Sequence, residues 1–316
     1  MAKYILTVTL NPALDRTLAV ESLRCGADFP SGVDFVIAGG KGVNVARVLA
    51  RIKHKVLATG LLGGNTGRTI ASFLQRENIP ASFATIAATT RVHTTIRETS
   101  HGRITRLLER GLPVTLNEFN KFKTHYQGLL KNASFVVFSG SLPPGLKNNS
   151  YRELIDMAHD RGIECALDTS GVPLRCGLQS APEIIKPNYE ELIALLGEKP
   201  GFKVDKATSI RLQKYHLRYA LLTLGDKGAW VSDFQDTLHI THAPIKGKNH
   251  VGCGDAFLAG FVGAMMRSKD IKSCSCLAAA CAAANLYAPY TGAISAGNVR
   301  RFKEHTIIRI KNNSNE

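Results

Sequence analysis

Two glycines and a carboxylate near the C-terminus form the stretch of the sequence whose residue types best suit chemistry. Val251-Gly-Cys-Gly-Asp255 leads directly into the apolar run from Ala256 to Val262, which has the composition of a buried helix. Gly252 and Gly254 allow a sharp turn, and a helix start offers unpaired N–H groups and the positive end of the helix dipole. Such a site suits a phosphate or a transition state that gathers negative charge. On these residues alone, an ordinary turn with Asp255 as a helix cap is an equal alternative.

A second glycine-led helix start lies near the N-terminus, at Gly39-Gly-Lys-Gly-Val-Asn44. Gly39 and Gly40 allow a ligand to approach the backbone, and Lys41 supplies a cation. Asn44 falls in the first helical turn, where its amide can hydrogen-bond a hydroxyl or a phosphate. The stretch lacks the Gly-Lys-Ser/Thr ending of a Walker A motif, so kinase chemistry would need a different scaffold.

Polar residues also end several strand-like runs. Asp15 follows the buried-strand pattern of Tyr4 to Leu10, and open α/β sheets bind ligands beyond the carboxyl ends of their strands. Asp15 is therefore a candidate acceptor for a sugar hydroxyl, with an Asx-type turn as the alternative. Later runs end in Ser139 and in Lys186 with Asn188, so polar groups converge on one edge of the predicted sheet.

Two segments, Thr90 to Arg97 and Arg103 to Leu108, alternate their side chains on either side of a turn signal, which predicts a β-hairpin. We expect the hairpin to project Arg91 and Arg106 together. Because guanidinium groups bind phosphate bidentately, two arginines facing a glycine-led helix start would form a phosphate clamp. A solvated surface hairpin is the alternative.

The rest of the chain alternates strand-like and helix-like segments in the pattern of βαβ units, which predicts an α/β fold. Short extended pieces at Thr17 to Val20 and Val33 to Ile37 predict a small peripheral β-structure. Cys274 to Pro289 has the composition of a helix of small residues. It would pack against the helix after Asp255 and leave a slot for a flat ring, lined by Asn285. Close packing without a slot is the alternative.

Length and composition narrow the class of protein. A chain of 316 residues with 44% hydrophobic content can bury a large core. The sequence has no signal-peptide pattern and no apolar run long enough to cross a bilayer, so we expect a cytoplasmic protein with no membrane partner.

The charge and the cysteine content narrow the class of protein further. The formal net charge of +15 suits nucleic acid, an anionic small substrate or a basic host proteome. Because the lysines and arginines are scattered with no basic-aromatic module, we expect no nucleic-acid partner. Seven cysteines, an odd number without paired metal spacing, predict free thiols in a reducing compartment and no zinc site.

Four motifs in order resemble the PfkB family of sugar kinases, which share the ribokinase fold. The motifs are Gly39-Gly-Lys-Gly-Val-Asn-Val-Ala46, Ser139-Gly-Ser-Leu-Pro-Pro-Gly145, Lys186-Pro-Asn188 with Glu191, and Val251-Gly-Cys-Gly-Asp255. The resemblance covers nearly the whole chain. Four ordered motifs at family-like spacing are specific, whereas any one glycine motif is weak.

The resemblance implies a ribokinase-like three-layer α/β/α fold with a mostly parallel central sheet and a small β lid. A single kinase domain would span residues 1–316, with lid segments at about residues 16–38 and 90–110. Lids of this family commonly pair, so we expect a homodimer formed through the lid.

The resemblance also implies a role for each motif. Asp255 matches the catalytic base that takes the proton from the acceptor hydroxyl, and Gly252, Cys253 and Gly254 match the backbone anion hole. The positions implied for the sugar phosphate are Asp15, Gly39, Gly40, Lys41, Asn44, Arg91, Arg106 and Ser139. Those implied for ATP are Lys186, Asn188, Thr223, Gly225, Gly228 and Asn285. Asn188 and Glu191 match an element that influences Mg²⁺, with the ion held through water.

The implied activity is the ATP-dependent phosphorylation of a ketohexose phosphate to the bisphosphate, with fructose 1-phosphate as the first expectation. Tagatose-6-phosphate kinase or 6-phosphofructokinase activity is the alternative. A nucleoside kinase and a non-catalytic sugar-phosphate sensor are more distant alternatives. Lys41, Arg91 and Arg106 favour a substrate that already carries a phosphate.

Three features depart from the family pattern. Cys253 and His250 stand where the family usually has alanine and threonine, Arg16 follows Asp15 where an uncharged residue is common, and Glu109-Arg110-Gly111 replaces a Glu-Pro-Gly-like turn. Cys253 is small enough to keep the turn, and at a helix N-terminus we expect a lowered pKa for its thiol. We expect the other two departures to lie near the sugar site.

Overall fold

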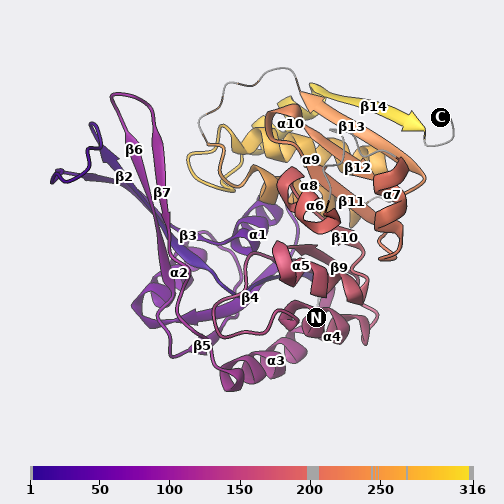
Figure 1. The fold of residues 1–316 in the computed structure, drawn as a ribbon, viewed down its shortest axis with the longest axis horizontal. Coiled ribbons are helices and arrows are strands. Elements are labelled where there is room, and N and C mark those ends of the chain that lie inside the picture. Colours follow the sequence, from indigo (N-terminus) through magenta and orange to yellow (C-terminus); the bar gives the residue numbers. More distant parts are fainter. Residues whose placement is uncertain are drawn as a thin grey trace.

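In the part of the chain that the structure describes, the fold is built on a ten-stranded sheet with the order β14-β13-β12-β11-β10-β9-β8-β1-β4-β5 (Figure 1). The computed structural model describes residues 3–197, 206–242, 245, 247, 249–267 and 270–312. The strands are β1 (Tyr4–Thr9), β4 (Val56–Gly63), β5 (Ala84–Ile86), β8 (Ala133–Ser139), β9 (Cys165–Asp168), β10 (Ile184–Ile185), β11 (Tyr219–Thr223), β12 (Ala229–Ser232), β13 (Asp236–His242) and β14 (Thr306–Asn312). Neighbours from β5 to β11 pair in parallel, and β12 to β14 extend the sheet antiparallel. This confirms the mostly parallel sheet predicted from the sequence.

Central strands contribute to two apolar cores, one on each face of the sheet. In β1, Ile5 belongs to one core and Leu6 to the other, and Phe135 and Val136 of β8 divide in the same way. This alternation follows from the two-residue period of a strand, and burial on both faces explains why these strands read as nearly continuous apolar runs.

Helices complete both cores and give the three-layer arrangement (Figure 1). One core contains side chains of α1 (Lys41–Arg51), α2 (Gly64–Arg76), α8 (Cys253–Met265), α9 (Ile271–Asn285) and α10 (Ala296–Glu304). The other contains side chains of α3 (Leu116–Leu130), α4 (Ser150–His159), α5 (Gly171–Gly177), α6 (Tyr189–Leu196) and α7 (Lys206–Gln213). Short 3₁₀ turns are η1 (Leu178–Ser180) and η2 (Gly225–Lys227). Within the described ranges, none of these helices has the length and apolarity that a bilayer-spanning helix requires.

A second sheet of four strands, with the order β3-β2-β6-β7, projects from the body at the left of Figure 1. Its strands are β2 (Ala13–Val20), β3 (Gly32–Gly39), β6 (Arg91–Glu98) and β7 (Ile104–Leu108). We call this sheet the lid. It contains the peripheral strands and the hairpin that the sequence predicts, whereas the single-domain organisation stays a prediction. All seven cysteines are free thiols, as their spacing predicted.

Candidate active site

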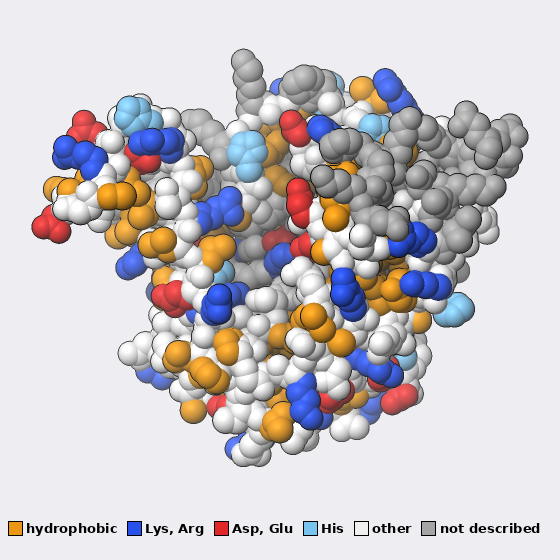
Figure 2. All heavy atoms as spheres, in the orientation of Figure 1, with side chains coloured by type: hydrophobic (Ala, Val, Ile, Leu, Met, Phe, Trp, Pro, Cys, Tyr) orange, Lys and Arg blue, Asp and Glu red, His pale blue; other side chains and the backbone are white. Residues whose placement is uncertain are grey.

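Charged side chains from four separate elements meet at the carboxyl ends of β9 and β10. Lys41 at the start of α1 donates to Asp168 at the end of β9 over 3.2 Å, and Lys186 after β10 lies 3.4 Å from the same Oδ1 atom. Asn44 of α1 donates from Nδ2 to Oδ2 of Asp255 on α8, over 2.8 Å. The face in Figure 2 is hollowed beside the lid, and acidic and basic side chains gather in that hollow.

Asp255 lies in the first turn of α8, which begins at Cys253. The preceding residue, Gly252, has a φ of 78°, a left-handed conformation that favours glycine, and a Cβ there would overlap the side chain of Thr291. The first amides of α8 have no partner within the helix, so they are available to an anion. Every residue of α8 from Asp255 onward is buried, so the helix carries this carboxylate into the protein with only 6% of its surface exposed.

The surroundings of Asp255 shift its acidity toward neutral pH. Burial and the nearby charge of Asp168 raise the pKa of Asp255 to about 6, against the opposing effects of Lys41, the Asn44 hydrogen bond and Lys186. A carboxylate with that pKa is ionised at pH 7 yet basic enough to accept a proton. This is the property that a general base requires.

Asp168 is the residue that holds the two lysines together, and it is not among the site residues predicted from the sequence. Its side chain is fully buried, and although burial raises its pKa, Lys186 and Lys41 lower it below the ordinary value. Lys41 responds in the opposite sense: burial lowers its pKa, but Asp168, Asp255 and Glu191 raise it above the ordinary value. The signal for Asp168 was present, because it ends a strand-like run as Asp15 does.

Ser139 supports Asp168 from the end of the neighbouring strand. It ends β8 and is fully buried, and its Oγ donates to Oδ2 of Asp168 over 3.2 Å. The strand end points this side chain into the protein, and its role toward a sugar phosphate stays a prediction. Its role in this structure is to support Asp168.

The lid places Asp15 next to the glycines that precede α1. A Cβ on Gly39 would overlap the carboxylate of Asp15, so a larger residue there would displace this carboxylate from its present position. Asp15 Oδ1 also lies 3.2 Å from Nδ1 of His93 on β6, a neighbour that the sequence analysis missed. Gly40 is the N-cap of α1 with a φ of 109°, and the roles of these residues toward a sugar stay predictions.

The two lid arginines do not project together, which corrects the sequence prediction. Arg106 pairs with Thr95, four residues along β6 from Arg91, a separation of about 14 Å at the usual rise of a strand. Arg91 donates to the carbonyls of Asn11 (2.7 Å) and Glu109 (2.9 Å) and so ties the base of the lid. The hairpin itself formed as predicted, but its register decided which side chains are neighbours.

Arg16, a departure from the family pattern that was predicted to lie near the sugar site, points away from Asp15. Arg16 directly follows Asp15 in β2, so its side chain lies on the opposite face of the lid, where it donates to Thr94 over 3.3 Å. The turn at Arg110 and Gly111 does lie near the base of the lid, since Asn11 donates to the carbonyl of Arg110 over 3.1 Å.

The residues predicted for ATP and Mg²⁺ follow β10 and β11. Asn188 and Glu191 form a reciprocal cap at the start of α6: Asn188 Oδ1 accepts from the Glu191 amide and Glu191 Oε2 from the Asn188 amide. The other carboxylate oxygen, Glu191 Oε1, lies 3.9 Å from Lys41 Nζ. Asn188 also bridges to Thr223 at the end of β11, from which the turn with Gly225 and Gly228 leads into β12. The nucleotide and metal roles stay predictions.

One expectation about the α8 and α9 region is wrong, and another stays a prediction. Asn285 is fully buried and its amide is used internally, donating to Val251 O (2.7 Å) and accepting from the Gly292 amide (2.8 Å), while its role at the nucleotide stays a prediction. Burial raises the pKa of the Cys253 thiol, outweighing the opposing effect of the hydrogen bond from Asn285, instead of the lowering expected at a helix start. Tertiary packing, which local sequence patterns do not show, decides the acidity of this thiol.

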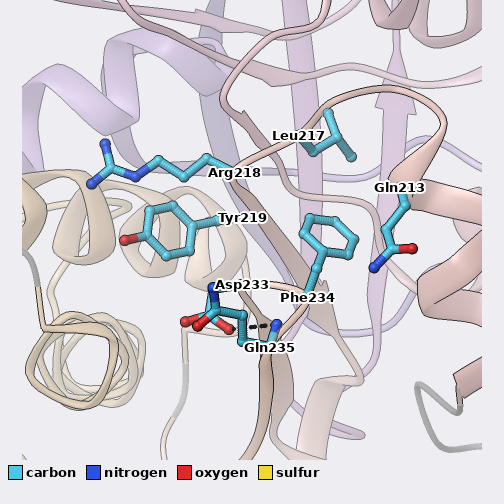
Figure 3. Close-up of a pocket in the computed structure, with 7 residues that line it drawn as sticks. All are labelled: Gln213, Leu217, Arg218, Tyr219, Asp233, Phe234 and Gln235. Carbon is cyan, nitrogen blue, oxygen red and sulfur yellow. Dashed lines mark hydrogen bonds between the residues drawn. The ribbon is translucent and has the colours of Figure 1, made fainter. Parts of the chain in front are cut away.

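A pocket of about 440 Å³ lies elsewhere, at the amino end of β11 (Figure 3). The residues around it are Gln213, Leu217, Arg218, Tyr219, Asp233, Phe234 and Gln235. Parallel sheets bind ligands beyond the carboxyl ends of their strands, and Thr223 marks that end of β11. This pocket lies at the opposite end of the strand, so its volume alone does not identify it as the reaction site.

His159, Cys165 and Glu183 form a group of possible metal ligands away from the Asp255 region, with their ligand atoms within 4.8 Å of one another. The sequence spacing did not predict this group. Glu183 Oε2 accepts from the amide of Cys165 over 2.6 Å and lies 3.4 Å from His159 Nε2. Burial raises the pKa of the Cys165 thiol well above its ordinary value, so the thiol stays protonated. The group is already satisfied by its own contacts.

Comparison with known proteins places this geometry in a family. The sequence model for the pfkB family carbohydrate kinase matches residues 36–296. The tagatose-6-phosphate kinase of Staphylococcus epidermidis strain RP62A is 33% identical over 269 residues, covering 84% of this chain and 86% of that protein. Crystal structures of Escherichia coli phosphofructokinase-2 superpose closely, and their folds confirm the ribokinase-like architecture. The complex with potassium has a TM-score of 0.90 at 26% identity, and the complex with fructose-6-phosphate has 0.88 at 25%, each covering 96% of this chain and 98% of the other. The chain belongs to the pfkB family of carbohydrate kinases.

Proposed function

We propose that this kinase transfers a phosphoryl group from ATP to a free hydroxyl of a ketohexose phosphate. Fructose 1-phosphate is the first expected acceptor, with tagatose 6-phosphate and fructose 6-phosphate as alternatives. The observation that carries the proposal is the position of Asp255 at the start of α8, where Asn44 of α1 donates to it and the charges of Asp168, Lys41 and Lys186 act on its pKa. The names of two relatives, a tagatose-6-phosphate kinase and a phosphofructokinase crystallised with fructose-6-phosphate, support the substrate class.

In the proposed reaction Asp255 is the general base. Asn44 occupies Oδ2, and among the described residues none donates a hydrogen bond to Oδ1, which leaves that oxygen for the acceptor hydroxyl. As the hydroxyl proton passes to Oδ1, the hydroxyl oxygen bonds to the γ-phosphorus and the bond to the bridging oxygen of ADP breaks. Because phosphoryl transfer depends on positioning and charge stabilisation, the free amides at the start of α8 would hold the negative transferring group.

Lys186 and Lys41, which both contact Asp168, would stabilise the remaining negative charge of the reacting phosphates. Lys186 would do so at the anion hole and Lys41 on the acceptor side. Lys186 is 5% exposed, and its Nζ lies 3.3 Å from where a Cβ on Gly254 would stand, so it borders the proposed anion hole. Lys41 is 40% exposed, is held by Asp168 and faces the acceptor side with Asn44 and Asp15. The lid would cover the acceptor and exclude water.

The residues present fit Mg-ATP. Glu191 Oε1 takes no part in the helix cap and is turned toward Lys41, so it would hold Mg²⁺ through water, with Asn188 beside it. When bound, Mg²⁺ neutralises phosphate charge. Thr223, Gly225 and Gly228 would border the nucleotide after β11.

The acceptor is tested by competition. Purified protein is given Mg-ATP with fructose 1-phosphate, fructose 6-phosphate and tagatose 6-phosphate, separately and in pairs, and bisphosphate formation is followed. We expect one ketohexose phosphate to exceed the others in kcat/KM by about tenfold or more, with fructose 1-phosphate first. Turnover with a nucleoside and with none of the three would refute the substrate class, and ATP binding without turnover on any acceptor would indicate a sensor.

Protection of Cys253 tests the placement of the anion hole. Cys253 is the first residue of α8 and is partly exposed, so phosphates bound to the neighbouring amides would cover it. We expect Mg-ATP to slow its alkylation at mildly alkaline pH, which favours the thiolate. Exposed Cys25 on the lid side is the matched control and should react equally with and without nucleotide. Equal rates at Cys253 in both conditions would place the phosphates elsewhere.

We also propose that two copies pair through their lids. The lid carries large apolar side chains that are exposed in the single chain: Val33 (61%), Leu107 (56%) and Leu108 (61%). Sedimentation should give the mass of a dimer, and Leu107→Glu should shift it toward the monomer. A wild-type monomer at micromolar concentration would contradict this pairing.

A further inference from the structure

Arg47 is a fully buried arginine on α1, one turn after Asn44, and no step of the proposed transfer uses it. Its Nη1 donates to Asn44 Oδ1 over 3.2 Å and to the carbonyl of Thr291 over 2.9 Å. Its Nη2 donates to the carbonyl of Ala38 over 2.8 Å and to Glu77 Oε1 over 3.0 Å. One guanidinium therefore joins the end of β3, the first turns of α1, the loop after α9 and a carboxylate at the end of α2.

The contact with Asn44 decides which way its amide faces. An asparagine amide has one accepting and one donating end, and a guanidinium can only donate. Arg47 therefore requires Oδ1 of Asn44 on its own side, which turns Nδ2 toward Asp255 Oδ2 at 2.8 Å. In the reverse orientation, the NH₂ group of Asn44 would face the guanidinium of Arg47, which places donor against donor. The amide oxygen of Asn44 would then face the carboxylate of Asp255, which places acceptor against acceptor.

The same guanidinium supports the turn that starts α8. Arg47 holds the carbonyl of Thr291, whose Oγ1 donates to the carbonyl of Val251 over 3.4 Å. The methyl group of Thr291 packs where a Cβ on Gly252 would stand. Arg47 thus reaches Asp255 by two routes, through the amide of Asn44 and through the backbone before the helix.

We propose that Arg47 is a positioning residue of the transfer reaction, which acts through Asn44 to hold the Asp255 carboxylate with Oδ2 occupied and Oδ1 turned to the acceptor. This inference rests on the proposed role of Asp255 as the base. The rival explanation is that Arg47 and Glu77 form a buried ion pair that serves stability alone.

The test is a double-mutant cycle with Arg47→Lys and Asn44→Ala. Lysine keeps the charge opposite Glu77 but lacks the fork that reaches Asn44, Thr291 and Ala38 together. We expect Arg47→Lys to lower kcat by about 10- to 100-fold, the loss typical when a residue that orients a metal ligand is replaced, with little change in the KM for ATP. In the Asn44→Ala background the same change should lower kcat by a smaller factor, because the route through Asn44 is already gone and only the route through Thr291 remains.

The pH profile gives a readout that a stability role would not change. Asp255 is faced by Lys41 of α1, Asp168 of β9, Lys186 after β10 and the Asn44 amide, and the amide favours the ionised carboxylate. In Arg47→Lys the acid limb of kcat/KM should move to higher pH as that donor is lost. Arg267→Lys is the matched control. Arg267 donates to the carbonyls of Ile52 (2.8 Å) and Lys53 (3.2 Å) at the far end of α1, and its replacement should leave kcat and the limb unchanged.

Two outcomes would overturn the inference. One is a folded Arg47→Lys protein with wild-type kcat and pH limb, and the other is independent, multiplicative losses in the cycle. If Arg47→Lys does not fold, NMR of the wild-type protein decides the matter: the side-chain NH₂ signals of Asn44, identified by their loss in Asn44→Ala, should titrate with Asp255, and their failure to do so would refute the orientation. An active Asp255→Asn enzyme would instead refute the proposed function itself, which separates the two failures.

Discussion

Asp255→Asn is expected to lower turnover by about 10²- to 10⁴-fold, the usual contribution of a general base. The amide keeps the size of the side chain but cannot accept the hydroxyl proton. ATP binding should be retained, because the amides at the start of α8 and the two lysines remain. Single-turnover kinetics and nucleotide titration measure the two effects separately, and near wild-type turnover would remove Asp255 from the role of base.

The stability of the same variant checks that it is folded. In the native protein the pKa of Asp255 is raised to about 6 from an ordinary value of 3.8, so the ionised group disfavours folding at pH 7. In the native state Asp255 takes up a proton as the pH falls through about 6. The stability that this group contributes therefore increases as the pH falls further, until the pH reaches the ordinary pKa of the group. Asp255→Asn should therefore unfold at a higher temperature than wild type at pH 7, with the difference shrinking in acid.

The pH dependence of the wild-type enzyme follows from the same group. The base must be ionised, so kcat/KM should fall about tenfold per pH unit below about pH 6. A fall in kcat/KM that begins only near pH 4 would mean that Asp255 is not held in the buried surroundings described above.

Asp168→Asn is the second change with a large expected effect, this time on stability. The variant leaves Lys186, 5% exposed, without its buried counter-ion, and removing one partner of a buried pair typically costs about 3–5 kcal/mol. The native pKa of Asp168 lies below its ordinary value, so its stabilising contribution is present above the ordinary pKa and is lost as pH falls through the lower native one. Urea unfolding at several pH values should show the largest deficit near neutrality.

Glu164→Gln is the matched control for Asp168→Asn, because Glu164 immediately precedes β9, at the end opposite Asp168. Its ion pair with Arg218 is half-exposed and should be worth less than about 1 kcal/mol. Asp168→Asn has a second readout, since the charge of Asp168 raises the pKa of Asp255. The acid limb of any remaining activity should move to lower pH. Equal stability losses in the two variants would show that the Asp168 cluster does not anchor the site.

The local pattern of the sequence was enough to predict an α/β fold, a β-hairpin and both glycine-led helix starts, and the family resemblance added the three layers and the lid. The features predicted from the local pattern depend on short-range physics: apolar periodicity selects strand or helix, and glycine permits the turn before α1 and the left-handed N-cap of α8. Side-chain chemistry at Lys41, Asn44 and Asp255 could be read from residue type and position in a first turn, and the structure brings these three residues together.

The direction of side chains, the register of the hairpin and the burial of charged groups could be determined only from the tertiary structure. The sequence could not show that Ser139 points inward, that Arg106 pairs with Thr95, or that Asp168 lies between two lysines. Asn44 and Asp255 are 211 positions apart in the chain, and Arg47 and Thr291 are 244 apart, so no local pattern links them. The acidity of a carboxylate and the orientation of an amide depend on neighbours in space. The sequence therefore determined which groups were available for chemistry, and the fold decided which of them act on one another.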